Sequence, residues 1–290
     1  MDSSPGYRLV RLPNGARSIH SLVYAETFHP VIGPAAEAKA LYVEQLGLVS
    51  RLAQHNGEFV VWDVGLGAAA NPITLQRATA HLPSRLRLVS FDQTLEPLRF
   101  ALAHAAELAY VGEYEPWLRQ LLAAPGQALT FDRQQQSVTW ELHLGDFPSF
   151  LTTSQAKELA KPHVILFDAY SPATNPAMWT QPLFASLFRL LEPNRPCVLP
   201  TYSRSTMLRV TLLLAGFFVG RGHATGEKEE TTIAANTLDL LADPLDEQWL
   251  KRVRNSTSAE PLWQPVYRQA PISSESWENL RWHRQFHRPG

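Results

Sequence analysis

The sequence predicts an α/β protein with a mostly parallel sheet that is covered by helices on both faces. Short apolar segments alternate with helical ones through the centre of the chain, and this alternation is typical of parallel strands joined by crossover helices. The last two apolar segments, 217–220 and 231–235, look like a closing pair of strands. We therefore expect the last strand of the sheet to run antiparallel to its neighbours.

The predicted strands are short and either wholly apolar or alternating. They cover residues 58–64, 85–91, 137–144, 163–167 and 196–202. Three of them end at or just before Gly65, Asp92 and Asp168. Ligands of parallel sheets bind at the carboxyl ends of the strands, so this edge is the expected site.

The predicted helices lie between these strands. They cover residues 35–55, 72–81, 95–110, 176–191 and 206–215. Pro176 is allowed in the first turn of its helix, and Gly216 is expected to end the last one.

The pattern divides the chain into three parts. Residues 1–57 are mixed, with a polar start that can form a hairpin, and we predict an N-terminal extension there. Residues 58–242 hold the strand–helix alternation and form the predicted central domain. Residues 243–290 lose that pattern and are rich in Trp, Pro and Arg, so we expect a basic, irregular C-terminal extension.

Composition excludes several classes of function. Lys and Arg total 26 and Asp and Glu total 27, so no global charge attracts nucleic acid or an anionic membrane. A single cysteine, Cys197, fits a reducing compartment. We see no signal-peptide core and no membrane-spanning run, and the ten histidines lack metal-ligand spacing. We therefore expect a cytoplasmic protein with no membrane partner and no metal.

A glycine-containing loop follows the first central strand. Asp63, Gly65 and Gly67 lead from the strand directly into a helix. Glycines let the backbone approach a ligand closely, and a helix N-terminus supplies N–H donors. Asp63 is placed to accept from a ligand ammonium, directly or through water. An ordinary strand-to-helix turn is the alternative.

Two further loops supply polar residues at the same edge. Asp92 ends the next strand, 25 residues after Gly67, where a carboxylate typically accepts from both hydroxyls of a ribose. Asp92 is alternatively a helix N-cap. Asp146 and Phe147 follow Gly145, and we expect them to accept from an adenine amino group and to pack on its ring. A plain Gly-Asp turn is the alternative there.

The loop after the buried strand 163–167 is the most informative. Asp168 is followed by Tyr170, Pro172 and Trp179, and Tyr202 ends the next strand on the same edge. We expect a rigid loop that places Asp168 beside the reacting group and lines the substrate pocket with the other four residues. A well-packed loop with an N-capping residue is an equally good interpretation.

These residues carry a resemblance to a known family. Residues 168–179, DAYSPATNPAMW, resemble the signature D-x-F-x-P-x-x-N-P-x-M-W of the MnmC-type methyltransferase domain, which modifies the wobble uridine of bacterial tRNA. Four other segments are similar to the family pattern, namely Glu26–Tyr42, Asp63–Asn71, Ser90–Leu98 and Thr201–Phe217. The resemblance spans about residues 26–236.

The resemblance implies a Rossmann-like class I methyltransferase fold. It implies that Gly65, Gly67, Asp92 and Asp146 hold S-adenosylmethionine and that Asp168 faces the substrate amine. The implied reaction is N-methylation of the 5-aminomethyl group of a tRNA wobble uridine or its 2-thio form, with residues 1–57 covering the cofactor site. Two positions depart from the family: Ala69 replaces a glycine, and Glu229 stands where a basic residue is usual.

Other functions remain open. A small amine in place of tRNA is one, and the neutral net charge favours it. A polyamine-synthase-like transfer is another, against which the Asn-Pro-x-Met-Trp loop argues. A third is a catalytically degenerate protein that binds cofactor or tRNA. The departures at Ala69 and Glu229 favour this interpretation, whereas the presence of Asp92 and Asp168 argues against it.

Overall fold

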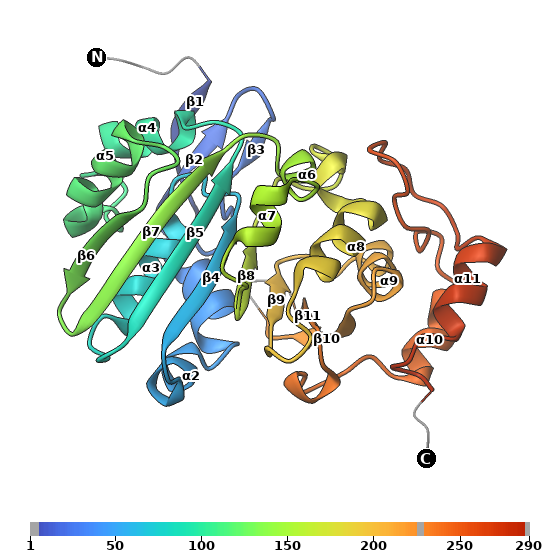
Figure 1. Cartoon of the computed structure of the whole chain (residues 1–290). Helices are drawn as coiled ribbons and strands as arrows, with labels where there is room; N and C mark the ends of the chain where they lie inside the picture. The colour runs from blue at the N-terminus through green and yellow to red at the C-terminus, as the bar shows by residue number, and fades with distance from the viewer. Residues whose placement is uncertain (1–5, 225–228, 288–290) are drawn as a thin grey trace. The chain divides into compact units, whose positions relative to one another are not determined.

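The computed structural model describes residues 6–224 and 229–287 (Figure 1). The chain forms two units, which are described separately below. The first comprises residues 1–147, 164–168 and 223–229, and the second comprises 148–163, 169–222 and 230–290.

The sheet strands of the first unit follow the order β8-β4-β5-β7-β6. Their bounds are β4 Glu58–Val64, β5 Arg85–Asp92, β6 Leu129–Arg133, β7 Gln136–Leu144 and β8 Val164–Phe167. The pairs β4–β8, β4–β5 and β5–β7 are parallel, while β6 runs antiparallel to β7. The four parallel strands were predicted within one residue at each end. The hairpin strand β6 was not predicted, because its exposed polar residues hide the apolar pattern.

The register of these strands brings their carboxyl ends to one edge. Asp63 pairs with Ser90 on β5 and with Leu166 on β8. Asp92 is the last residue of β5, and Asp168 directly follows β8, with its backbone N–H donating to Val64 O at 3.0 Å. The three aspartates singled out in the sequence therefore lie at one edge.

Helices connect the strands of the first unit. They are α3 Ala70–Thr79, α4 Glu96–Ala103, the 3₁₀ turn η2 Gly112–Tyr114 and α5 Glu115–Ala123. The predicted helix 95–110 ends early, at Ala103, and turns follow it. Helix α5 was not predicted.

Residues 7–27 form a small antiparallel sheet. It contains β1 Tyr7–Arg11, β2 Arg17–Ser21 and β3 Glu26–Thr27, which agrees with the expected hairpin-forming start. Three helical pieces follow, namely α1 Pro34–Ala38, the π-helical η1 Lys39–Glu44 and α2 Leu48–Gln54. The prediction of one continuous helix over 35–55 is wrong, because Gly47 adopts a left-handed conformation with φ 54° and separates α2 from η1.

The second unit contains the closing strands. Strand β11 Thr231–Ala235 runs antiparallel to both β10 Phe218–Gly222 and β9 Val198–Thr201. The expected antiparallel last strand is thus confirmed. The helices are α6 Phe147–Phe150, which begins at the unit boundary, α7 Ser154–Glu158, η3 Pro176–Trp179, α8 Gln181–Leu190 and α9 Thr206–Leu214. The predicted helix 176–191 is divided at Thr180, whose side chain accepts from Leu183 N and caps α8.

The C-terminal residues are more regular than expected. They form η4 Leu238–Leu240, α10 Glu247–Val253 and α11 Ser274–Arg281. The side chains of Asp246 and Ser273 cap α10 and α11. Gln285 is buried and bonds to Val219 N, Val219 O and Leu245 O at 2.7–2.8 Å. The expectation of an irregular extension is therefore only partly right: residues 254–273 form no helix or named strand, whereas two capped helices flank them and Gln285 joins the segment to β10.

Among residues 6–224 and 229–287, no helix combines the length and the apolar character that a membrane span requires.

Candidate active site

The loop after β4 is bound to the end of β5. Gly67 N donates to Asp92 Oδ2 at 2.8 Å, and both Gly65 N and Leu66 N donate to Phe91 O. Gly65 and Gly67 have φ 92° and 52°, so both use the left-handed freedom of glycine. Because the Gly67 amide is already bound by a carboxylate, the loop is not arranged to bind a phosphate at that amide. It is suited to a ligand that approaches the two oxygens of Asp92.

Ala69 has the same left-handed conformation, with φ 61°, at the N-cap position of α3. An alanine there is strained by about 1 kcal/mol. The backbone therefore keeps the geometry that a glycine would give, although the family favours glycine at this position. The departure at Ala69 leaves the loop conformation intact.

A buried polar network lies beneath this loop. Asp63 is fully buried and accepts from Ser90 Oγ at 2.8 Å through Oδ2. Ser90 Oγ in turn accepts from Trp140 Nε1 at 2.9 Å. Asp63 Oδ1 is buried and has no hydrogen-bond partner among the described residues. That oxygen is an acceptor available to a ligand donor.

Burial changes the titration of these acids. Burial raises the pKa of Asp63 to about 7, the bond from Ser90 opposes the rise, and the nearby Asp168 and Asp92 add to it. Burial also raises the pKa of Asp92, against the lowering effect of backbone N–H groups that include Gly67 and Thr94. Carboxyls with raised pKa values at one edge favour a cationic ligand, which stabilises their ionised forms.

Asp146 and Phe147 lie beside Asp92. Gly145 N donates to Asp92 O at 2.9 Å, so the two loops are joined by their backbones. Asp146 is exposed, and Phe147 is buried with its ring edge-on to Phe91 at 5.0 Å between centroids. Phe147 therefore forms part of the apolar wall next to Asp92.

Asp168 meets residues from the N-terminal part of the chain. Its Oδ2 accepts from Asn71 Nδ2 at 2.7 Å and lies 3.4 Å from His29 Nε2. On its other side, His29 Nδ1 lies 3.8 Å from Glu37 Oε1. Phe28 is also close to the loop, since a Cβ added to Gly67 would lie 3.3 Å from Phe28 Cε2. Residues 26–37 thus lie against the edge that holds the acids.

The remaining predicted residues belong to the second unit. Trp179 is fully buried, and its Nε1 donates to Tyr170 O at 2.7 Å. Tyr202 Oη donates to Ala169 O at 3.0 Å and its ring lies edge-on to Trp179. Pro172 is half-buried in the turn that Ser171 O closes by accepting from Thr174 N and Asn175 N. Trp179 and Tyr202 therefore hold the loop in place, and contact of these four residues with a substrate stays a prediction.

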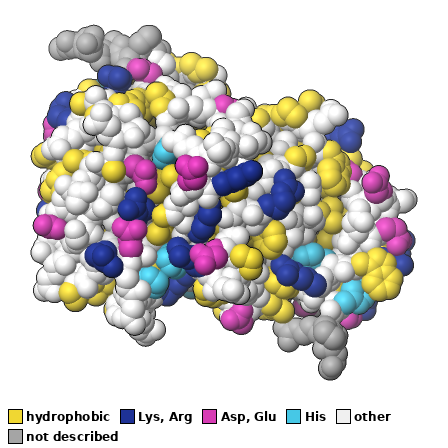
Figure 2. Space-filling model, viewed as in Figure 1, with side chains coloured by type: hydrophobic (Ala, Val, Ile, Leu, Met, Phe, Trp, Pro, Cys, Tyr) yellow, Lys and Arg dark blue, Asp and Glu magenta, His cyan; other side chains and the backbone are white. Residues whose placement is uncertain are grey.

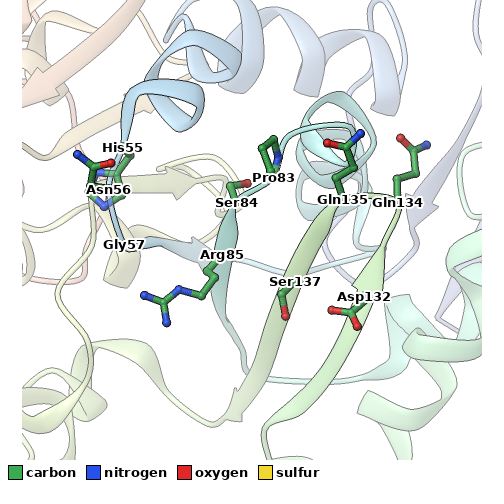
Figure 3. Close-up of a pocket in the computed structure, with 10 residues that line it drawn as sticks. All are labelled: His55, Asn56, Gly57, Pro83, Ser84, Arg85, Asp132, Gln134, Gln135 and Ser137. Carbon is green, nitrogen blue, oxygen red and sulfur yellow. The ribbon is translucent and has the colours of Figure 1, made fainter.

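A polar pocket of about 530 Å³ lies elsewhere in the first unit. Figure 3 shows it lined by residues at the amino ends of β4, β5 and β7, including Gly57, Arg85 and Ser137. None of the predicted site residues lines it. Ligands of parallel sheets bind at the opposite, carboxyl edge, so this pocket is a separate feature of the molecule.

The donor set fits S-adenosylmethionine. In the part of the chain that the structure describes, no group of three or more His, Cys, Asp or Glu side chains is arranged to hold a metal ion. The edge instead offers the carboxylates of Asp63, Asp92 and Asp168. They match a ligand that has a ribose diol and carries positive charge on a sulfonium and an ammonium group. Asp63 Oδ1, which has no hydrogen-bond partner among the described residues, has the chemistry to accept from such an ammonium.

The sequence alone assigned no individual role to three residues of this edge. His29, Glu37 and Asn71 lie in segments that are similar to the family pattern, but nothing singled them out there. Their contacts with one another and with Asp168 join positions that are far apart in the chain, so no local periodicity reveals them. The only sequence signal near them is that each is a polar residue close to a glycine or a proline.

Comparison with known proteins agrees with this geometry. Residues 110–237 match a family described as S-adenosyl-L-methionine-dependent methyltransferase. The chain is 31% identical over 244 residues to the tRNA 5-methylaminomethyl-2-thiouridine biosynthesis bifunctional protein MnmC of Pseudomonas putida, which covers 80% of this chain. It is 29% identical over 209 residues to the protein of the same name from Aeromonas salmonicida, covering 67% of this chain.

These relatives are much longer. The matched region is 35% of the Pseudomonas protein and 30% of the Aeromonas protein, so the chain spans about a third of the curated relatives that it matches. Among solved structures, MNMC2 from Aquifex aeolicus has the same fold, with a TM-score of 0.66 and 21% identity over 96% of this chain and 84% of that one. The predicted Rossmann-like class I methyltransferase fold and the S-adenosylmethionine cofactor are confirmed. The chain is an S-adenosyl-L-methionine-dependent methyltransferase and belongs to the MnmC-type methyltransferase domains.

Proposed function

We propose that the chain methylates the nitrogen of a 5-aminomethyl group on a tRNA wobble uridine. The observation that carries the proposal is the position of Asp168, at the same sheet edge as the cofactor acids Asp63 and Asp92 and bound by Asn71. The relatives are named for 5-methylaminomethyl-2-thiouridine biosynthesis in tRNA. An aminomethyl nitrogen is the acceptor that such a product requires.

The cofactor-binding residues have distinct roles in this proposal. Asp63 accepts from the ammonium of S-adenosylmethionine, and Asp92 accepts from both ribose hydroxyls. Gly65 and Gly67 let the backbone approach, while Asp146 and Phe147 hold the adenine by its amino group and its ring. Residues 1–57 cover the bound cofactor, which the position of Phe28 against Gly67 supports.

Asp168 is the proposed catalytic residue. S-adenosylmethionine supplies an electrophilic methyl group. An alkylammonium is protonated at pH 7 and has to lose a proton before its lone pair can attack. The Asp168 carboxylate orients this group and takes up the proton, while Tyr170, Pro172, Trp179 and Tyr202 shape the loop that excludes water around it.

A small amine is the second candidate acceptor. The net charge is −1, and Glu229 is exposed where the family favours a basic residue. Lys and Arg side chains are interspersed with Asp and Glu side chains on the face shown in Figure 2. RNA binding normally uses a concentrated basic surface. One observation favours tRNA instead. Trp282 is 64% exposed and lies beside Arg281, and such a pair is suited to stacking on bases.

The test is transfer of labelled methyl groups from S-adenosylmethionine to bulk tRNA of a strain that lacks this wobble methylation. The proposal expects label in tRNA, recovered after digestion in a nucleoside that has gained one methyl group at its aminomethyl nitrogen. Fully modified tRNA is the control and should accept none. Label in small amines but not in tRNA would favour the second candidate. Failure of all acceptors, despite cofactor binding, would favour a degenerate protein.

A cytoplasmic location is part of the same proposal. Its support is the single cysteine, Cys197, which is buried and free.

A further inference from the structure

His29 lies between two carboxylates at the acceptor side of the site. Its Nε2 is 3.4 Å from Asp168 Oδ2, and its Nδ1 is 3.8 Å from Glu37 Oε1. The side chains of these three residues are only 9%, 13% and 8% exposed, in the order His29, Asp168, Glu37. An imidazolium in this place can donate from both nitrogens, whereas a neutral imidazole can donate from only one.

The backbone around His29 is held in an uncommon conformation. His29 has φ 47°, a left-handed value that few residues other than glycine and asparagine adopt. Phe28 fixes it from one side, since Phe28 N donates to Ile19 O and Phe28 O accepts from Ser18 Oγ. Strain of this kind, held by surrounding hydrogen bonds, is found preferentially at functional sites. Here it directs the imidazole toward Asp168.

The proposed reaction needs a proton acceptor, and an imidazole at this position can serve as one. An alkylammonium has an ordinary pKa of about 10 and a carboxyl one of about 4, so Asp168 alone is a poor final acceptor for the ammonium proton. An imidazole, with an ordinary pKa of about 6.5, accepts it at a smaller cost. The neutral form of the ring is the acceptor, and the carboxylates on its two sides stabilise the imidazolium that it becomes.

We propose that His29 is a positioning and proton-accepting residue, which takes from Asp168 the proton of the substrate ammonium while Glu37 holds the ring. This inference rests on the proposed amine methylation. In the balanced reaction, the amine lone pair forms the N–C bond, and the S–C bond breaks with its electron pair left on sulfur. One proton passes from the ammonium to Asp168 and then to His29, which releases it to solvent after turnover.

The charged groups around His29 come from several elements. Glu37 belongs to α1, Asp168 follows β8, and Asp63 on β4 interacts electrostatically with Asp168. Asn71 of α3 donates to the same Asp168 oxygen that faces His29. Asn71 therefore holds Asp168 in place while the proton moves, because its amide neither gains nor loses a proton.

The first test is the substitution His29→Asn in the full chain. Asparagine tolerates the left-handed backbone and keeps hydrogen bonding, but it cannot carry the proton. We expect kcat for hypomodified tRNA to fall about 10²-fold at pH 7, with the Kd for S-adenosylmethionine unchanged. The matched control is His20→Asn. His20 is a β2 residue that contacts Thr27 Oγ1 at 2.8 Å, so this change perturbs the same small sheet, and it should leave kcat near wild type.

The pH profile separates a proton role from a merely structural one. As pH approaches the ordinary ammonium pKa of about 10, solution supplies the free amine and the relay is no longer needed. The His29→Asn defect should then shrink to within about threefold of wild type. Glu37→Gln should show a smaller defect with the same trend. An equal loss at every pH, or no loss at pH 7, would overturn the inference.

A readout without activity keeps the two proposals distinguishable. The NMR titration midpoint of the His29 imidazole should fall in both Asp168→Asn and Glu37→Gln, because each removes a carboxylate that stabilises the imidazolium. If wild-type protein does not methylate tRNA, the proposed acceptor is wrong, and this titration still tests the relay. A midpoint that stays the same in both variants would contradict it.

Discussion

Gly67 combines a left-handed backbone with contacts to two other parts of the proposed cofactor site. Its φ is 52°, its amide donates to Asp92, and an added Cβ would lie 3.3 Å from Phe28 Cε2. Gly47 has nearly the same φ, 54°, and nothing within 4 Å of an added Cβ. The two glycines thus share a left-handed backbone and differ in what surrounds them.

Comparing Gly67→Ala with Gly47→Ala separates these effects. Both should lower the free energy of unfolding by about 1 kcal/mol, since alanine is strained in the left-handed region. Only Gly67→Ala should weaken S-adenosylmethionine binding, by about tenfold or more, which is about 1.4 kcal/mol. Chemical denaturation and calorimetric titration measure the two quantities. Equal cofactor affinity in both variants would show that the loop does not bind the cofactor.

The raised pKa of Asp63 predicts that both stability and cofactor binding depend on pH. Its pKa is about 7 in the folded protein against an ordinary 3.8. The unfolded chain therefore loses this proton first as pH rises, and the contribution of Asp63 to stability, full below about 3.8, decreases through about 7. A cationic ligand beside Asp63 favours the carboxylate, so cofactor binding near pH 6 should release a proton.

Calorimetry at pH 6 in buffers of different ionisation enthalpy measures this release. Affinity for S-adenosylmethionine should rise as pH increases toward 7, by less than about tenfold per unit for one proton. Asp63→Asn should remove most of the release, and the remainder reports Asp92, whose pKa is also raised. Proton release that is the same in Asp63→Asn would place the titrating group elsewhere.

The residue types of the cofactor edge could be predicted from sequence, and the partners of Asp168 could not. Gly65, Gly67 and Asp92 stand where strands end, and at that position a glycine or an acid seldom contributes to core packing. His29 and Glu37 precede the central domain, and their distance in sequence from Asp168 leaves no pattern to detect. Nothing in the sequence indicated that Trp179 is fully buried and donates to Tyr170 O, and its contact with a substrate stays a prediction.

At the scale of elements, Ser90 joins three adjacent strands. Its hydroxyl donates to Asp63 on β4 and accepts from Trp140 on β7, while Ser90 itself lies on β5. All three residues are buried. The hydroxyl therefore satisfies two groups that have no contact with water.

Ser90→Ala should lower the free energy of unfolding by about 3 kcal/mol, because two buried polar groups lose their partner. It should also raise the pKa of Asp63 further, since the Ser90 bond now lowers it. Ser84→Ala is the control. Gln136 Nε2 would lose Ser84 Oγ and keep Thr79 Oγ1, so a cost of about 1 kcal/mol or less is expected. Equal costs in the two variants would mean that the network contributes no extra stability.

Element predictions succeeded where burial dominates. The strands β4 and β8 are almost wholly buried and most of β5 is buried, and their apolar runs gave bounds within one residue of the structure. The helix predicted over 35–55 failed at Gly47, and the one over 176–191 failed at Thr180, because caps and left-handed residues are local events that apolar spacing does not report. The helices α10 and α11 were missed because they are only 7 and 8 residues long and each buries only two residues, which is too few to give a helical apolar pattern.

At the scale of the whole molecule, three acids lie at one edge of the sheet of the first unit, and the proposal assigns cofactor binding and chemistry to different ones. We propose that the first unit binds S-adenosylmethionine through Asp63, Asp92 and the glycine loop, and that Asp168 of that unit acts on the acceptor amine. If Asp92 binds the cofactor and Asp168 acts on the acceptor, substitution of Asp92 should weaken cofactor binding and substitution of Asp168 should slow turnover. Acids that only stabilise the fold would not divide the two effects in this way.

The most direct measurement is the Kd for S-adenosylmethionine and the turnover at saturating cofactor, both determined for Asp168→Asn and Asp92→Asn. We predict that Asp168→Asn keeps the Kd within about threefold and loses about 10²-fold or more in turnover. Asp92→Asn should raise the Kd about tenfold and largely retain turnover at saturation. Turnover within about threefold of wild type in Asp168→Asn would contradict the central claim.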